Sequence, residues 1–330
     1  MAKKLFFALK LFISFGLMAY VVHKTGLDTE EGRARFKDIL SDINPVYFAL
    51  SLLIGVLLNI TSSWRWQILL RSKKIKVSLL RLLGYYYIGR FFNMFMPTSM
   101  GGDVARIWDL GKYTGDNYEA FASVFMERFI GMVVLAAVSG VVLLGHDQAL
   151  PLITNSLLFV IALVLFILWL VIDIRVFDFF ARLFGRIHPF FSKIFAKLRE
   201  VHHAIYSYKN DKKTLAFVVS ISTMFYMLAV INVWISSRAF SVDIPFTDML
   251  LAVPAIMLIM NLPVSIGGLG LMEAAYTTIF VLFGYPPELA LSTALLMRFK
   301  TIVNAFIGGI VHLSRIGEAP QAKAAEAAKD

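Results

Sequence analysis

The stretch "NMFMPTSMGGDVAR", residues 93–106, decides the fold of this chain. It places a Pro, two adjacent Gly, an Asp and an Arg inside sequence that is otherwise apolar and helix-like. Pro and Gly interrupt helices, and the freed backbone N–H groups are tolerated in a bilayer only where protein, water or ligand satisfies them. A second stretch, "NLPVSIGGLGLMEA" (residues 261–274), repeats this pattern. The two stretches predict two interrupted helices within a membrane protein.

The composition also indicates an integral membrane protein. The chain has 330 residues, of which 58% are hydrophobic and 16% charged, and its mean hydropathy is +0.73. A soluble domain could not keep so much apolar surface out of water. The net charge is +10, but the basic residues fall in short loops, which favours orientation in the membrane and contact with anionic lipid over nucleic-acid binding. The chain has no Cys, which excludes disulfides, thiolate metal sites and a cysteine nucleophile.

Six apolar runs reach the length of roughly 20 residues that a spanning helix needs. They cover about 5–22, 45–63, 118–145, 150–172, 214–237 and 287–313. The first run follows two Lys as in a signal peptide, but no small-x-small cleavage site follows it, so we expect an uncleaved helix. Two shorter runs, 82–97 and 247–262, end at the Pro and Gly-Gly turns and are followed by helix-like stretches over 103–113 and 270–284.

Loop charges predict the orientation of these segments. The segment 64–81 has six Lys or Arg and no acid, and the segment 173–213 has nine bases against four acids, so both are predicted to be cytoplasmic. Together, the spans 118–145 and 150–172 cross the membrane and cross back. Residue 113 is therefore predicted to be on the cytoplasmic side, as the segment 173–213 is. The stretch 82–113 must then enter and leave on the cytoplasmic side as a re-entrant hairpin, and 247–284 forms the matching hairpin from outside. In the alternative, each hairpin arm crosses the bilayer fully.

The two halves of the chain share a pattern. Asn59, Ser62-Ser63 and Arg65 are echoed by Asn232, Ser236-Ser237 and Arg238; Pro97-x-Ser99-x-Gly101-Gly102 by Pro263-x-Ser265-x-Gly267-Gly268; and "VFMERF" (124–129) by "LLMRF" (295–299). The offsets are 173, 166 and 170 residues, so the order is kept with small changes in length. Because the two hairpins enter from opposite sides, the pattern predicts an inverted repeat, which is a transporter architecture.

The predicted organisation is that of an all-α polytopic membrane protein with about six full spans and two re-entrant hairpins, in the bacterial cytoplasmic (inner) membrane with both termini cytoplasmic. Its parts are an N-terminal span and outer loop (1–44), a first repeat unit (45–145, hairpin 82–113), a connecting span (146–172), a basic amphipathic segment (173–213), a second repeat unit (214–313, hairpin 247–284) and a disordered tail (314–330). The helix over 174–209 is expected to lie on the cytoplasmic leaflet.

The hairpin turns are the predicted functional site. Gly lets a head group approach the backbone, and the N-terminus of the following half-helix favours an anion. The alternative is that the turns only cap short helices, which two matching turns of opposite orientation disfavour. The predicted substrate-binding residues are Asn93, Ser99, Gly101, Gly102, Asp103, Arg106, Glu127, Arg128, Asn261, Ser265, Gly267, Gly268, Glu273 and Arg298.

Charges inside a bilayer are costly, so the charged members of this set should face the interior and pair. We expect Glu127 to pair with Arg298 or Arg106, and Arg128 with Asp103 or Glu273. Arg65, Arg90 and Lys300 are interpreted as structural ion pairs or as side chains that snorkel at helix ends, and Tyr85-Tyr86-Tyr87 as an interfacial aromatic belt. No catalytic set, metal-ligand spacing or nucleotide loop is found in the sequence, so no cofactor is expected.

The stretches "PTSMGGDVAR", "MERF" and "PVSIGGLGLMEA", with a late "MRF" followed by Gly308-Gly309, resemble the membrane domain of bacterial lysylphosphatidylglycerol synthetases over roughly residues 5–313. The resemblance implies translocation of a lipid between leaflets, and in the synthetases that lipid is aminoacylated phosphatidylglycerol. This chain is expected to lack the soluble aminoacyl-transferase domain that makes it. An anionic phospholipid or a polyprenyl-linked lipid is therefore an equally plausible substrate.

These observations favour a non-enzymatic flippase or scramblase whose partners are the bilayer and an anionic or polyprenyl-linked lipid. The alternative is a non-transporting membrane partner that docks a lipid-modifying enzyme or glycosyltransferase through the 174–209 helix. An intramembrane transferase is disfavoured because the sequence has no catalytic set. No nucleic-acid partner is expected, and the oligomeric state stays open.

Overall fold

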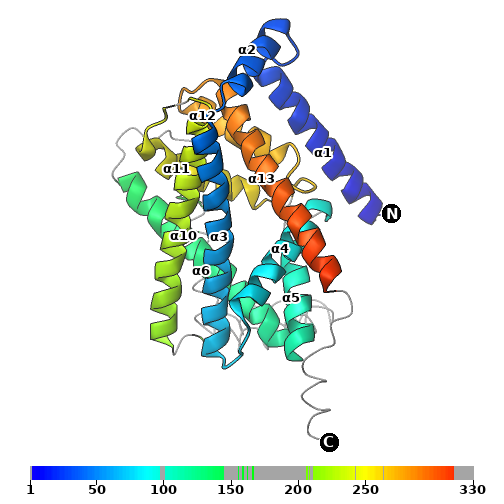
Figure 1. The fold of residues 1–330 in the computed structure, drawn as a ribbon, viewed down its shortest axis with the longest axis vertical. Coiled ribbons are helices and arrows are strands. Elements are labelled where there is room, and N and C mark those ends of the chain that lie inside the picture. Colours follow the sequence, from blue (N-terminus) through cyan, green and yellow to red (C-terminus); the bar gives the residue numbers. More distant parts are fainter. Residues whose placement is uncertain are drawn as a thin grey trace, which may run out of the picture.

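A computed structural model describes residues 2–96, 101–144, 211–241, 243–262 and 264–315, together with isolated positions between 155 and 208. These ranges are helical and contain no strand (Figure 1). The helices are α1 (Ala2–Lys24), α2 (Glu30–Ser41), α3 (Pro45–Ser72), α4 (Leu79–Phe95), α5 (Gly101–Thr114), α6 (Asn117–Leu144), α10 (Lys212–Arg238), α11 (Phe246–Met260), α12 (Leu271–Leu282) and α13 (Pro287–Ser314). The predicted all-α class is confirmed for this part of the chain.

Local signals set where several of these helices begin. Asn44 caps α3 by accepting hydrogen bonds from the backbone N–H groups of Val46 (3.0 Å) and Tyr47 (3.4 Å), and Pro45 occupies the first helical position. Ser78 caps α4 in the same way. Asp211 caps α10 through a bond from the N–H of Thr214 (3.0 Å). The helices therefore start where short polar side chains can satisfy the first free N–H groups.

Four of the described helices, α3, α6, α10 and α13, are long and apolar enough to cross a membrane. They correspond to four of the six predicted spans. The predicted first span forms α1, which is outside this set, while the predicted span 150–172 and the basic segment 173–213 lie outside the described residues apart from isolated positions. The predicted tail 314–330 also lies outside them beyond residue 315.

The predicted span over about 45–63 is shorter than the helix that contains it. Helix α3 continues to Ser72, and Arg65 lies buried within it. The extra turns are stable because Trp66, Leu69 and Leu70 are completely buried on the same helix. The buried Arg65 is tolerated there because it pairs with the carboxylate of Glu127.

Helices α3 and α10 lie side by side and run in opposite directions (Figure 1). The N–H of Asn44, just before α3, donates to the carbonyl of Ala239, just after α10 (2.8 Å). Further along, the ring of Trp64 meets the ring of Phe217 near the start of α10, with 5.9 Å between centroids. The first helix of one half of the chain is thus antiparallel to the first helix of the other half.

Two pairs of shorter helices fill the space between the long ones. The pair α4–α5 joins the lower end of α3 to the lower end of α6, and the pair α11–α12 joins the upper end of α10 to the upper end of α13 (Figure 1). The glycine turn between α11 and α12 meets the end of α4, because a Cβ on Gly267 would lie 2.6 Å from the backbone oxygen of Met94. The second pair of short helices therefore contacts the first pair from the opposite end.

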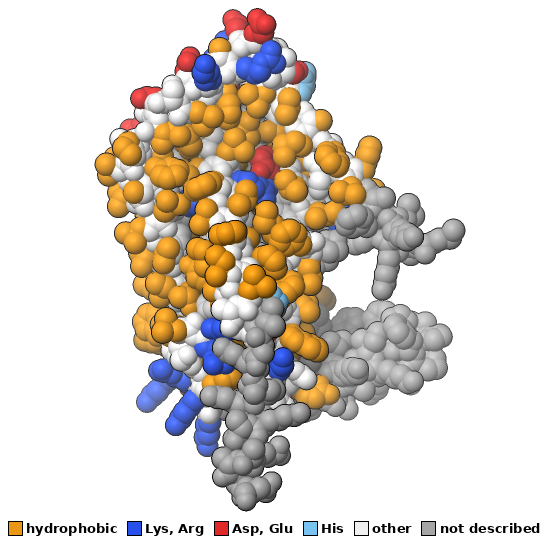
Figure 2. Space-filling view, turned by 45° about the vertical axis from the view of Figure 1, so that its right-hand side comes forward, with side chains coloured by type: hydrophobic (Ala, Val, Ile, Leu, Met, Phe, Trp, Pro, Cys, Tyr) orange, Lys and Arg blue, Asp and Glu red, His pale blue; other side chains and the backbone are white. Residues whose placement is uncertain are grey.

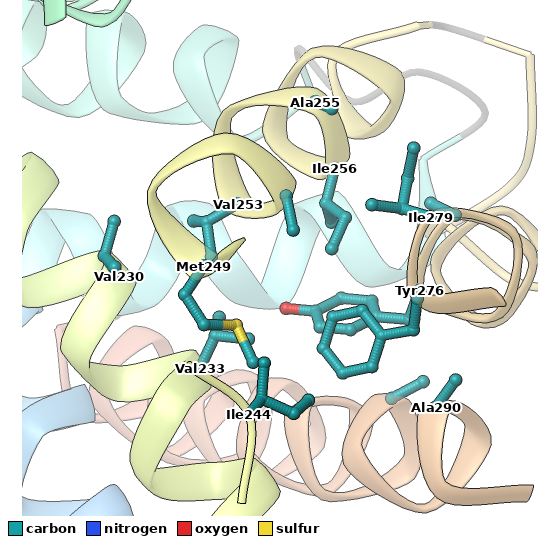
Figure 3. Close-up of a cluster of buried hydrophobic side chains, with 14 of the residues drawn as sticks. Val230, Val233, Ile244, Met249, Val253, Ala255, Ile256, Tyr276, Ile279 and Ala290 are labelled. Carbon is teal, nitrogen blue, oxygen red and sulfur yellow. The ribbon is translucent and has the colours of Figure 1, made fainter. Parts of the chain in front are cut away.

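The apolar core of the second half lies between α10, α11, α12 and α13. Val230, Met249, Ile256, Tyr276 and Ala290 point toward one another in this core (Figure 3). The visible outer surface is apolar across the middle of the molecule, whereas Lys and Arg project from the lower end (Figure 2). Small groups of acidic and basic side chains appear within the apolar band, so charges are also present at its centre (Figure 2).

The crossing of α13 over α4 requires a glycine. A Cβ on Gly308 would lie 1.9 Å from the backbone oxygen of Tyr87, whereas a Cβ on Gly16 in α1 would have no neighbour within 4 Å. Gly308→Ala is expected to lower the free energy of unfolding by about 1–3 kcal/mol, because two backbones must separate. Gly16→Ala is the control and should not destabilise the protein. Thermal unfolding in detergent checks this, and equal melting temperatures would contradict the crossing.

Candidate functional site

Glu127 on α6 is a buried carboxylate held by three other helices. Its Oε1 accepts a hydrogen bond from Nη2 of Arg65 on α3 (2.5 Å) and another from the hydroxyl of Tyr86 on α4. Its Oε2 accepts from Nη2 of Arg106 on α5. The side chain of Glu127 is 3% exposed, so these bonds replace the water that the charge has lost. One carboxylate thereby joins the four helices of the first half.

Arg106 lies against aromatic rings as well as against Glu127. Its guanidinium carbon lies 4.3 Å from the centroid of Trp66 and 3.9 Å from that of Tyr86. The face of an aromatic ring attracts a cation, so both rings stabilise the buried charge. The Nε1–H of Trp66 in turn donates to Oγ of Ser123 (3.0 Å), which fixes the ring.

The prediction that Tyr85-Tyr86-Tyr87 forms an interfacial aromatic belt is wrong. All three tyrosines are buried, at 4%, 8% and 9% exposure. Tyr86 has a carboxylate partner for its hydroxyl, which removes the need for contact with interfacial water. The residues lie inside because α4 is packed between α5, α3 and α13.

Two further ion pairs occupy matching positions in the two halves. Asp103 in the first turn of α5 pairs with Nε of Arg128 on α6. Glu273 in the first turn of α12 pairs with Arg298 on α13, with Nε to Oε1 at 2.8 Å and Nη2 to Oε2 at 3.0 Å. The partners are 25 residues apart in both pairs. Each pair ties the second arm of a hairpin to the long helix that follows it.

The two arginines differ in how many of their donors are used. Arg298 also donates to the carbonyls of Gly267 (2.9 Å) and Gly268 (2.5 Å), and its side chain is only 13% exposed. Arg128 is bound only by Asp103 within the described residues, and its side chain is 37% exposed. Arg298 therefore holds the glycine turn in place, whereas the terminal nitrogens of Arg128 bind no other side chain among the described residues.

Two interior cations have only neutral partners among the described residues. Lys300 on α13 is buried and donates to Oδ1 of Asn232 (2.9 Å) and Oγ of Ser236 (2.8 Å). Arg90 on α4 is half-buried and donates to Oδ1 of Asn59 (3.1 Å). These amide and hydroxyl oxygens satisfy hydrogen bonds but do not neutralise the charge. Both positions therefore favour an additional anion.

The first glycine pair permits close packing. A Cβ on Gly102 would lie 2.3 Å from the backbone oxygen of Gly89, and a Cβ on Gly101 would lie 2.6 Å from Cβ of Met96. The N–H of Gly102 donates to Oδ1 of Asn93 (2.5 Å). The N-terminus of α5, which was predicted to face a head group, is thus partly capped by a side chain of the neighbouring helix.

The remaining predicted site residues lie in the second turn, except one. Asn261 donates to the carbonyl of Met257 at the end of its own helix (2.8 Å), and Ser265 is buried. Gly267 and Gly268 have φ values of 57° and 71°, a conformation that residues with a Cβ rarely adopt. Ser99 lies outside the described residues.

The structure decides between the predicted pairings. The pairs of Glu127 with Arg106 and of Arg128 with Asp103 are confirmed, while the alternatives that placed Glu127 with Arg298 and Arg128 with Glu273 are wrong. Sequence reasoning missed that Arg65 and Tyr86 bind Glu127 and that Arg298 binds Glu273. The common separation of 25 residues was a signal that could have identified the Glu273–Arg298 pair.

Comparison with known proteins places this arrangement in a family. Residues 7–309 match the family described as the lysylphosphatidylglycerol synthase TM region. The chain belongs to this family. A similar protein is a UPF0104 membrane protein of Methanothermobacter thermautotrophicus (strain ATCC 29096 / DSM 1053 / JCM 10044 / NBRC 100330 / Delta H), which is 24% identical over 315 residues, covering 88% of this chain and 92% of that protein.

The lysylphosphatidylglycerol synthase TM region covers every residue of the site, from Asn59 to Lys300. The resemblance predicted from the glycine turns and the arginine motifs is therefore confirmed. The family assignment identifies a membrane domain of the lysylphosphatidylglycerol synthase type, which fits the apolar helices.

Removal of the charge of Glu127 should destabilise the bundle. Glu127→Gln keeps the shape of the side chain but leaves Arg65 and Arg106 without their carboxylate, so the free energy of unfolding should fall by about 3–5 kcal/mol. Asp243→Asn is the matched control, because it removes the carboxylate of the exposed pair with Arg238 and should cost less than about 1 kcal/mol. Melting temperatures of both variants in detergent test this, and similar losses would contradict a central role for Glu127.

Proposed function

We propose that this protein is a flippase- or scramblase-like transporter that moves an anionic phospholipid or a polyprenyl-linked lipid between leaflets. The observation that carries the proposal is the excess of positive charge inside an apolar helix bundle. In the described helices α3 to α6, α12 and α13, the interior cations are Arg65, Arg90, Arg106, Arg128, Arg298 and Lys300, and the interior carboxylates that pair with them are Asp103, Glu127 and Glu273. Six cations face three carboxylates in this part of the chain, so a phosphate group would reduce the imbalance.

Three of these cations are the best candidates for contact with a head group. Arg128 has unused donors and is partly exposed, and Arg90 and Lys300 have only neutral partners within the described residues. Arg90 also lies within electrostatic range of Arg128. The head group of a lipid would bind these cationic side chains one after another, while the acyl chains of the lipid stay in the bilayer.

The arrangement of the helices supports a transporter. We propose that residues 45–145 and 214–313 form an inverted repeat, each with a long helix, a re-entrant pair of short helices and a second long helix. The antiparallel α3 and α10, the contact of the second glycine turn with α4 and the equivalent ion pairs support this proposal. Inverted repeats with broken helices near the midplane allow one half to move against the other around a central site.

The charge distribution supports an orientation. Basic and acidic side chains are mixed at the upper end of the molecule, whereas Lys and Arg project from its lower end (Figure 2). We propose that this end faces the cytoplasm of a bacterial cell, with both termini on the same side, in agreement with the positive-inside rule. The lower hairpin, α4–α5, then opens to the cytoplasm and the upper hairpin, α11–α12, to the outside.

Lipid exchange in proteoliposomes tests the proposed activity. Labelled phosphatidylglycerol, a labelled polyprenyl phosphate and labelled phosphatidylcholine are compared for wild type and for Arg128→Gln. We expect exchange of an anionic lipid, and at least a tenfold slower rate for Arg128→Gln, since a charge-assisted hydrogen bond contributes about 1.5–3 kcal/mol. Arg238→Gln is the control, because Arg238 pairs with the exposed Asp243, and its rate should equal wild type.

Two outcomes would contradict the transport proposal. Equal exchange of phosphatidylcholine would mean that the interior cations do not select the substrate. Absence of exchange for every lipid with folded protein would refute transport, and co-purification of a lipid-modifying enzyme or glycosyltransferase in stoichiometric amount would then favour the docking role.

Arg128 and Arg298 should differ in their effects on stability. Arg298→Gln removes the bonds to Glu273 and to the carbonyls of the glycine turn, and should lower the free energy of unfolding by about 3 kcal/mol or more. Arg128→Gln leaves Asp103 with Arg106 at 3.4 Å and should cost less than about 1 kcal/mol. Unfolding in detergent measures both, and a larger loss for Arg128→Gln would refute the division between a ligand-binding and a structural arginine.

A further inference from the structure

A cavity of about 800 Å³ lies at the lower end of α3, and none of the charged residues named above lines it. It is lined by Gln67, Arg71, Lys74, Lys76, Val77 and Ser78. Three of these side chains are cationic and none is acidic. Among the described residues, Arg71, Lys74 and Lys76 form no ion pair, so nothing in this part of the chain neutralises the cavity. Its charge favours an anionic ligand.

The backbone around the cavity is well fixed. The buried side chain of Gln67 donates from Nε2 to the carbonyl of Val77 (2.8 Å), which ties the α3–α4 connection to the helix. The N–H of Lys74 donates to the carbonyl of Arg71 (2.9 Å), which closes the end of α3. The basic side chains therefore extend from a defined loop at the start of α4.

Lys74 occupies a position that favours glycine. Its φ is 62°, in the left-handed region that a residue with a Cβ enters at an energetic cost, and a helix commonly ends in this conformation with Gly. A lysine at this position is unfavourable for the backbone, yet it is one of the residues that line the cavity. Backbone strain of this kind is found preferentially at functional sites.

The surroundings of the cavity point to a lipid. Helix α3 is long and apolar enough to cross a membrane, so its end lies at the membrane boundary. Leu80, two residues after Ser78, is 79% exposed and offers an apolar surface beside the basic residues. A phospholipid can use both surfaces, whereas free phosphate can use only the cations.

We propose that this cavity binds the phosphate group of an anionic phospholipid from the adjacent leaflet, with Arg71, Lys74 and Lys76 as its ligands. The site is separate from Arg128, Arg90 and Lys300, so the proposal does not depend on lipid transport. Bound lipid at this position would hold the α3–α4 connection, and with it the hairpin α4–α5, at the membrane surface.

Binding of short-chain phosphatidylglycerol to the purified full-length protein in detergent tests the site, with thermophoresis as the readout. Lys74→Gly should raise the Kd about fivefold, the effect of one basic residue at an anionic lipid surface. Its melting temperature should equal or exceed that of wild type, because Gly relieves the positive φ. Lys74→Arg should retain wild-type affinity, and Lys213→Ala, at the start of α10, is the control for a basic residue outside the cavity.

Each contrary result would overturn a defined part of the proposal. An unchanged Kd for Lys74→Gly would exclude the cavity as the site. Equal affinity for short-chain phosphatidylcholine would exclude recognition of the anionic head group. Inorganic phosphate that binds as tightly as phosphatidylglycerol would mean that the cavity takes free phosphate and that the lipid assignment is wrong.

Discussion

The interaction of Glu127 with Arg65, Arg106 and Tyr86 is the constraint on which the first half of the bundle depends. A buried carboxylate is stable only when its oxygens are satisfied, so the four helices that carry these groups must meet at one point. That requirement explains why α3 continues beyond residue 63, where the predicted span ends, and why Tyr86 is buried in the bundle. It also places the aromatic rings of Trp66 and Tyr86 where they can stabilise Arg106.

The described residues of the second half contain no equivalent of this cluster, although the sequence there repeats the other motifs of the first half. At the offset of 170 residues, the counterpart of Glu127 is Met297. At the offset of 173 residues, the counterpart of Arg65 is Arg238, which pairs with the exposed Asp243. The two hairpins are nevertheless anchored in the same way, by an acid in the first turn and an arginine 25 residues later. The two halves therefore share the acid–arginine pair of their hairpins but differ in what they bury. The first half buries the ionic cluster around Glu127, and the second half buries an apolar core.

This difference bears on the proposed transport. A site that must bind and release a phosphate group needs cations that are not fully neutralised, and it also needs fixed elements that keep those cations in place. Glu127 and Glu273 bind Arg65, Arg106 and Arg298 tightly and supply the fixed elements. Arg128, Arg90 and Lys300 supply the charge that remains. The basic cavity at the end of α3 adds a second anion-favouring surface.

The sequence by itself determined that this is an all-α membrane protein, that two glycine turns interrupt its helices, and that the charges near them pair. Apolar run length, Pro-Gly turns and the cost of a buried charge act locally, so residue order reveals them. Only the tertiary structure decided which arginines pair with Glu127, that Arg65 is buried and that Gly267 contacts Met94. These features depend on how helices rotate about their axes and cross one another, and packing of the whole bundle sets that geometry.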